Sequence, residues 1–126
     1  MKEATTIRVL VVEYDADVRC TTVEALRRRG HEIRAVEDGG TATALARSWA
    51  PDVVFLGIAP PRLDGWTAHR IATQAHGTGR IPVVAITAEQ GGEISPVEGI
   101  VALLRRPLTA DEILKAAERH ALKNEG

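Results

Sequence analysis

The sequence predicts a single doubly wound α/β domain, with a parallel sheet lying between layers of helices. Five short runs of mostly apolar residues recur along the 126-residue chain, and each has about the length of a strand. Segments with the apolar spacing of helices lie between these runs, and such alternation is typical of a parallel sheet. The expected strands are residues 7–12, 32–36, 53–56, 82–87 and 99–104.

The first, third and fourth runs are nearly continuous in apolar residues. Strands that are buried on both faces of a parallel sheet have this composition, whereas half-exposed strands alternate apolar and polar residues. These three runs are therefore expected in the middle of the sheet. The connections between parallel strands should be right-handed.

The first and last helices are predicted from their end signals. The first should begin near Asp15 or Asp17 and stop at Gly30, because aspartate is a good N-cap and glycine a good C′ residue. The last should begin with the capping-box pattern at residues 109–112 and run to about residue 123.

The middle helices have weaker signals. Apolar spacing predicts helices over residues 42–49 and 66–75. Between residues 87 and 99, the pair Gly91-Gly92 and the proline Pro96 disfavour a helix. A helix in that segment is expected to be short, distorted or missing.

Composition narrows the class of protein. The net charge is −1, so no general attraction to nucleic acid or to a membrane surface is expected. The first residues lack a signal-peptide pattern, and no apolar run approaches the ~20 residues of a membrane helix. The lone Cys20 cannot form an internal disulfide, which suits a reducing cytosol. We therefore expect a cytoplasmic, single-domain protein over residues 1–126, with output through a separate protein.

Short motifs follow the expected strands in a fixed order. VLVVEYD closes the first strand, PPRLDG follows the third, VVAITA closes the fourth and LLRRPL closes the fifth. No single motif is specific, but the ordered set resembles the receiver domain of bacterial two-component response regulators (CheY-like) from about residue 7 to 122. The resemblance implies a flavodoxin-like fold with strand order 2-1-3-4-5.

The resemblance also implies a lost phosphorylation site. Receiver domains gather three carboxylates around Mg²⁺, phosphorylate one aspartate, and neutralise the phosphoryl charge with a lysine. The matching positions here carry Glu13 and Tyr14 for the first two acids, Gly57 for the acceptor and Arg106 for the lysine. Glycine has no side chain and cannot be a nucleophile. The resemblance thus implies a degenerate receiver with no catalytic residue, no metal site and no cofactor.

Weak Mg²⁺ binding is the most that this set implies, through Glu13, waters and the backbone carbonyl of Ala59. Two hypotheses concern Arg106: it pairs with Glu13 and closes the empty pocket, or it extends into water. Tyr14 is expected to fill the volume of the missing metal. The degenerate pocket is expected to comprise Glu13, Tyr14, Gly57, Ala59, Thr87, Arg106 and Pro107.

The resemblance also implies that the conformational switch of receiver domains is incomplete in this chain. Receivers couple a threonine or serine on the fourth strand to an aromatic residue on the fifth. Thr87 matches the first position, but the aromatic position carries Leu103. A leucine cannot make the ring or hydroxyl contacts of an aromatic residue, so Thr87 is expected to be structural.

These features favour a stand-alone interaction module in two-component signalling that works without aspartyl phosphorylation and is not an enzyme. The expected partner is a histidine kinase or a separate effector, and a homodimer stays open. One alternative is a small-anion sensor at Gly57 and Arg106. Another is a receiver phosphorylated at a different acid, with Glu13, Asp15 and Asp64 as the candidates.

The histidines and Trp66 give weaker signals. The four histidines lack metal-ligand spacing and are expected on the surface. Trp66 follows Asp64-Gly65 and is expected to pack its helix onto the sheet.

Overall fold

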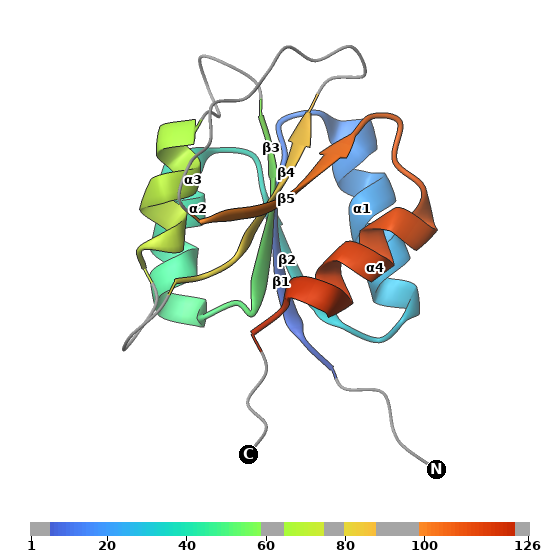
Figure 1. Cartoon of the computed structure of the whole chain (residues 1–126), viewed down its shortest axis with the longest axis horizontal. Coiled ribbons are helices and arrows are strands. Elements are labelled where there is room, and N and C mark those ends of the chain that lie inside the picture. The colour runs from blue at the N-terminus through green and yellow to red at the C-terminus, as the bar shows by residue number, and fades with distance from the viewer. Residues whose placement is uncertain (1–5, 59–64, 75–79, 88–98, 123–126) are drawn as a thin grey trace.

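The computed structural model describes residues 6–58, 65–74, 80–87 and 99–122. A central sheet of five parallel strands lies between two layers of helices (Figure 1). The strands are β1 (Arg8–Val12), β2 (Glu32–Val36), β3 (Val53–Gly57), β4 (Val83–Thr87) and β5 (Ile100–Arg105). In the described ranges the helices are α1 (Ala16–Arg28), α2 (Gly39–Trp49), α3 (Gly65–Ala72) and α4 (Ala110–His120).

The strand order is β2-β1-β3-β4-β5, with every pair parallel. This confirms the predicted doubly wound sheet and its order. β3 and β4 are buried along their whole length, and β1 is buried except at Arg8. The edge strands β2 and β5 have exposed positions, as strands with one paired side have in this type of sheet.

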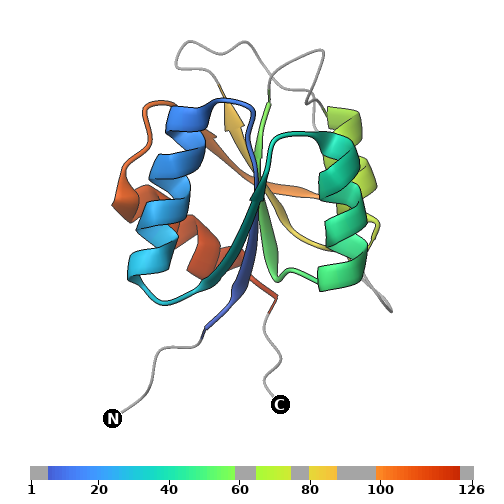
Figure 2. The ribbon, with the colours of Figure 1, turned by 180° about the vertical axis from the view of Figure 1, so that it is seen from behind.

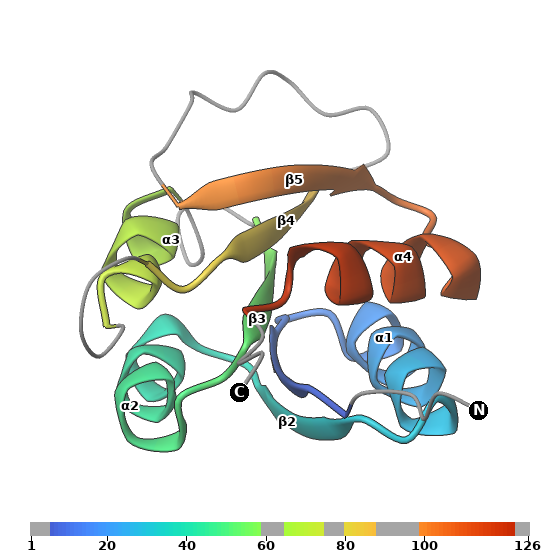
Figure 3. The ribbon, with the colours of Figure 1, turned by 60° about the horizontal axis from the view of Figure 1, so that its bottom comes forward.

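Each face of the sheet carries two helices. α1 and α4 cover one face, and α2 and α3 cover the other, as the views from behind and from below show (Figures 2 and 3). Alternate side chains of a strand point to opposite faces, so β1 supplies Val9 and Val11 to one core and Leu10 and Val12 to the other.

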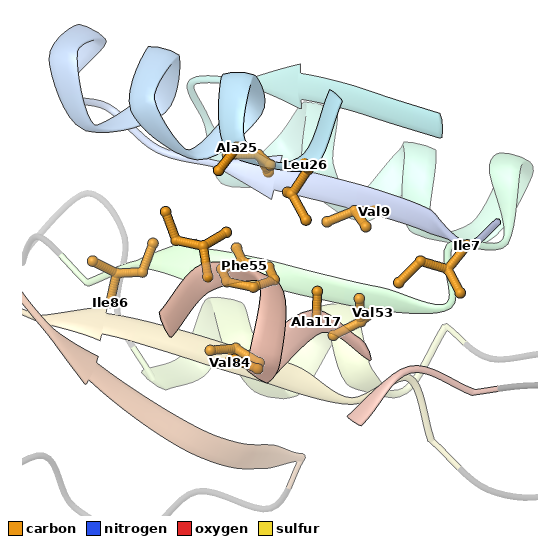
Figure 4. Packing of buried hydrophobic residues seen from close by; sticks show 12 residues of the cluster. Ile7, Val9, Ala25, Leu26, Val53, Phe55, Val84, Ile86 and Ala117 are labelled. Carbon is orange, nitrogen blue, oxygen red and sulfur yellow. The ribbon is translucent and has the colours of Figure 1, made fainter. Parts of the chain in front are cut away.

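The core under α1 and α4 is built around Phe55 of β3 (Figure 4). Leu26 of α1 and Ala117 of α4 point into it, together with Val84 and Ile86 of β4. All of these side chains are fully buried. Burying a large apolar side chain stabilises a fold by about 1.5–3 kcal/mol, so this layer contributes strongly to holding both helices in place.

Helix ends follow the predicted signals where a side chain caps them. Asp15 caps α1, accepting hydrogen bonds from the backbone N–H groups of Asp17 and Val18, and Gly30 beyond its end has a φ of 88°. Thr109 caps α4 through a complete capping box with Glu112. These caps satisfy N–H groups that lack partners inside the helix.

Three helices differ in length from the prediction. α2 begins at Gly39, three residues earlier than expected, because Asp38 accepts a hydrogen bond from the N–H of Thr41 and so caps a first turn that contains two glycines. α3 ends at Ala72 rather than at residue 75. The last helix likewise ends at His120, and Ala121 is already extended.

The expectation of surface histidines was wrong for His31, and His76 lies outside the described residues. His31 is buried, between the start of β1 and α4: its Nδ1 accepts a hydrogen bond from the N–H of Ile7, and its Nε2 lies 2.8 Å from Oε2 of Glu118. Arg29 also pairs with Glu118 at 3.1 Å. A polar cluster therefore joins the turn before β2 to α4 at the amino edge of the sheet.

Trp66 was also placed wrongly, because its side chain is 74% exposed instead of packing on the sheet. The expected helix between residues 87 and 99, and the residues Ala59 and Asp64, lie outside the described residues. No helix in the described ranges is long and apolar enough to cross a membrane.

Candidate functional site

The carboxyl ends of the parallel strands bring the predicted site residues to one edge of the sheet. Glu13 follows β1 directly, Gly57 ends β3, and Thr87 ends β4. Arg106 follows β5 directly, and its backbone N–H donates to the carbonyl of Thr87 at 3.1 Å, which extends the ladder between β4 and β5. The fold therefore places residues that are up to 93 positions apart in sequence on the same edge.

An ion pair between Glu13 and Arg106 lies at the centre of this edge. Nη2 of Arg106 donates to both carboxylate oxygens of Glu13, at 3.0 Å each. The Glu13 side chain is 1% exposed and that of Arg106 is 26% exposed. The hypothesis that these residues pair is confirmed, and the alternative in which Arg106 extends into water is wrong.

The Glu13 carboxylate lies where a side chain at position 57 would begin. A Cβ added to Gly57 would be 2.5 Å from Cδ and 2.8 Å from Oε2 of Glu13, closer than real Cβ contacts. The glycine therefore does not leave a vacated pocket, because the neighbouring strand fills that space with a carboxylate.

Tyr14 does not have the expected role of filling the metal's volume. Its side chain is 49% exposed, while the adjacent Glu13 is buried. Of these two consecutive residues, only Glu13 is therefore enclosed at the site.

Backbone donors and a second arginine hold the segment after β1. The N–H of Asp15 donates to Oε2 of Glu13 at 3.0 Å. Nη1 of Arg19 donates to the carbonyl of Glu13 at 2.9 Å and to that of Tyr14 at 3.4 Å, and it lies 3.8 Å from a carboxylate oxygen of Glu37. The sequence analysis missed Arg19, since nothing in the local pattern shows that this side chain turns back along the helix.

Asp15 is an anion at this edge. The backbone N–H of Val18 holds the pKa of the Asp15 carboxyl below its usual range, against a smaller opposing effect of desolvation. The N–H of Asp17 and the positive charges of Arg106 and Arg19 add to the lowering. Asp15 is thus ionised as the cap of α1 at neutral pH.

The two switch positions are on the neighbouring strands. Thr87 is buried, and its hydroxyl donates to the backbone carbonyl of Leu104 at 3.4 Å. Leu103 is 43% exposed in the edge strand β5, where burial alternates along the strand. Pro107 follows Arg106 through a cis peptide bond. A cavity of about 170 Å³ lies beside Arg106 and Pro107, and its other lining residues are Asp17, Val18, Thr21 and Leu108.

The family model for the response regulator receiver domain matches residues 9–118, from β1 to the last helix. The chain belongs to the response regulator receiver family. This receiver domain is 32% identical to protein PilH of Pseudomonas aeruginosa over 112 residues, which cover 86% of this chain and 92% of PilH. It is 28% identical to the chemotaxis protein CheY of Bacillus subtilis over 114 residues, which cover 89% of this chain and 95% of CheY.

Solved structures agree with the assignment. NtrX from Brucella abortus superposes on the receiver domain with a TM-score of 0.75 at 28% identity, over 92% of this chain and 27% of the longer NtrX chain. A CheY-like receiver protein from Methanospirillum hungatei has a TM-score of 0.75 at 15% identity, which shows the shared fold. The protein is therefore a receiver domain of the two-component signalling type.

Proposed function

We propose that this receiver domain works in two-component signalling as a protein–protein interaction module without phosphorylation of an aspartate at the end of β3. The observation that carries the proposal is the Glu13 carboxylate, buried against Gly57 and paired with Arg106. A phosphoryl acceptor at this position needs a side chain, a free carboxylate oxygen and access for the donor. Position 57 offers no side chain, and the space beside it is filled.

The family's magnesium site does not fit the residues present. Mg²⁺ prefers several oxygen ligands in octahedral geometry. Both carboxylate oxygens of Glu13 already accept hydrogen bonds from Arg106, whose positive charge would repel a cation in the same place. The next position is the half-exposed Tyr14, which brings no carboxylate. We therefore expect Mg²⁺ to bind weakly or not at all.

The alternative functions lose support at particular residues. Glu13 is buried, so a phosphodonor in solution cannot reach its carboxylate without a rearrangement. The Asp15 carboxylate already accepts two backbone N–H groups as a helix cap. A small anion at Gly57 would meet the Glu13 carboxylate at the point where it should approach Arg106. These alternatives become outcomes of the experiment below.

The proposed partner is another signalling protein, either a histidine kinase or a separate effector. A domain whose state does not depend on a phosphoryl group presents one surface to that partner at all times. Recognition then depends on the folded surface alone, and it should need neither Mg²⁺ nor a phosphodonor.

The test is amide-resolved NMR of the domain, titrated first with Mg²⁺ and then with Mg²⁺ and beryllofluoride, a phosphoryl mimic. Intact mass after incubation with a small acyl-phosphate donor provides a second readout. A receiver domain with an acceptor aspartate is the positive control. The proposal expects no saturable shifts at residues 13, 57, 87 and 106, and no mass gain of one phosphoryl group.

Each contrary result identifies a different alternative. A mass gain of one phosphoryl group shows an active receiver, and fragmentation then locates the acceptor. Shifts around Gly57 and Arg106 with inorganic phosphate alone show an anion sensor. Saturable shifts with Mg²⁺ alone show a metal site stronger than the weak one expected, and any of these three results overturns the proposal.

A further inference from the structure

The ion pair at the carboxyl edge bridges strands that are not neighbours. β3 and β4 lie between β1 and β5 in the sheet (Figure 3). Adjacent strands are about 4.8 Å apart, so the backbones at the ends of β1 and β5 are separated by about 14 Å. Only two long side chains that extend toward each other can close such a gap.

The geometry of the pair shows that Arg106 uses its full reach. Its terminal nitrogen Nη2 makes both contacts to Glu13. Its Nε, nearer the backbone, is buried and has no hydrogen-bond partner among the described residues. The pair therefore depends on the length of both side chains as well as on their charges.

The bridge also passes the end of β3, the strand next to β1. That strand ends in Gly57, and any Cβ there would overlap the Glu13 carboxylate. A side chain at position 57 would push the carboxylate away from its place. The glycine is thus a steric requirement of the bridge, in addition to being the position that lacks an acceptor.

We propose that Glu13, Gly57 and Arg106 form a built-in latch, in which the Glu13 carboxylate is the permanent counter-ion of Arg106 and Gly57 leaves the space that the carboxylate needs. The latch ties the segment after β5 to the end of β1. Arg106 is only three positions before Thr109, the N-cap of α4. Opening the latch therefore changes the entry into α4, and the latch holds the domain in one conformation without any ligand.

This inference deepens the proposed function, since it supplies a physical reason for a constant interaction surface. It depends on the coupling of three residues and not on phosphorylation chemistry. Its test accordingly uses no phosphodonor and no metal, so the two proposals can fail separately.

The test is a double-mutant cycle between positions 13 and 57, measured by urea unfolding. Gly57→Ala should raise the unfolding equilibrium constant at least tenfold, because its Cβ overlaps the carboxylate. Glu13→Asp keeps the charge, withdraws the carboxylate by one methylene and breaks the bridge. In the Glu13→Asp background, Gly57→Ala should raise the unfolding equilibrium constant less than threefold, since the space beside Gly57 is already open.

Gly40→Ala is the matched control for adding a methyl group to a glycine. A Cβ at Gly40 would meet only Asp38, at an ordinary 3.4 Å. This substitution should change the unfolding constant by less than threefold in either background. It separates the specific overlap at position 57 from the general effect of replacing glycine on the unfolded chain.

A conformational readout distinguishes a latch from a merely structural contact. Gly57→Ala, Glu13→Asp and Arg106→Gln should all shift the amide resonances of the first turn of α4 in the same direction. A cost of Gly57→Ala that is equal in both backgrounds overturns the proposal. Resonance shifts that are confined to the neighbourhood of each substitution, with α4 unaffected, also overturn the proposal. If Gly57→Ala does not fold, Glu13→Asp and Arg106→Gln alone provide this readout.

Discussion

Both ends of the sheet carry a buried ionisable side chain paired with a long charged partner, but the two clusters join different parts of the fold. At the carboxyl edge, Glu13 and Arg106 connect the ends of two strands. At the amino edge, His31 connects the turn before β2 to Glu118 on α4. At the carboxyl edge, the absence of a side chain at Gly57 leaves the space that the Glu13 carboxylate occupies. At the amino edge, His31 lies between the start of β1 and α4.

The difference shows what each cluster does for the domain. The Glu13 carboxylate accepts hydrogen bonds from Arg106 and from the N–H of Asp15, so two donor groups determine its position. His31 accepts from the N–H of Ile7 and contacts Glu118, which is itself a third exposed. The cluster at the carboxyl edge is thus an ion pair whose carboxylate is fully buried. The cluster at the amino edge, which we call the His31 clamp, attaches α4 through a partly exposed carboxylate.

Removing the cation at the carboxyl edge should have the largest effect. Arg106→Ala leaves the Glu13 carboxylate buried without its counter-ion, and breaking such a pair costs about 3 kcal/mol of unfolding free energy. Glu13→Ala should cost less, about 2 kcal/mol, because the partly exposed Arg106 can then turn into water. Urea unfolding of both variants measures this order, and the reverse order would contradict the view that Glu13 is the buried member of the pair.

Removing the imidazole at the amino edge should have a smaller effect. His31→Ala leaves the N–H of Ile7 without its acceptor and should lower the unfolding free energy by about 2 kcal/mol. His120→Ala, on the same helix as Glu118, is the control and should change it by about 0.5 kcal/mol or less. Equal losses in the two histidine variants would show that the His31 clamp contributes nothing specific.

Acid should weaken the carboxyl edge in a selective but small way. Asp15 and Asp38 cap α1 and α2 at this edge, and backbone N–H groups, of Val18 and Thr41 respectively, lower the pKa of each carboxyl. A carboxyl with a lowered folded-state pKa stabilises the fold fully above its ordinary pKa of 3.8, and this contribution is lost as the pH falls through the folded-state value.

Hydrogen exchange of single amides between neutral pH and about pH 3 checks this prediction. The N–H groups of Val18 and Thr41 should lose protection as the caps take up protons. The N–H of Ile58, just after β3, is the internal control, because its acceptor is the backbone carbonyl of Ile86, which does not titrate. Parallel loss at all three amides would instead indicate global unfolding.

The sheet could be predicted because its signals are local. Continuous apolar runs identify the buried strands, and the order of the motifs after them implies the topology that the structure shows. The capping box at Thr109 locates the start of α4. The start of α2 was missed because two glycines argue against a helix, while the cap at Asp38 stabilises its first turn.

The site could be predicted only in part. The places of Glu13 and Arg106 at the ends of β1 and β5 suggested their pairing as one of two hypotheses, and the structure decided between them. That the carboxylate fills the space beside Gly57, while Tyr14 turns outward, depends on side-chain direction and packing that one sequence does not show. His31 and Glu118 are 87 positions apart and belong to no motif, so their contact needed the structure.

The two tryptophans give the two ends of the sheet separate optical labels. Trp49 lies near the amino edge, with the guanidinium groups of Arg8 and Arg34 at 5.6 and 5.0 Å from its ring centroid. Trp66 lies in the first turn of α3, the helix after β3, and is open to water. A soluble quencher should therefore reach Trp66 first, and the emission that survives should come mainly from Trp49. With no added dye, intrinsic fluorescence can therefore distinguish a partner that covers the carboxyl edge from a partner that covers the amino edge.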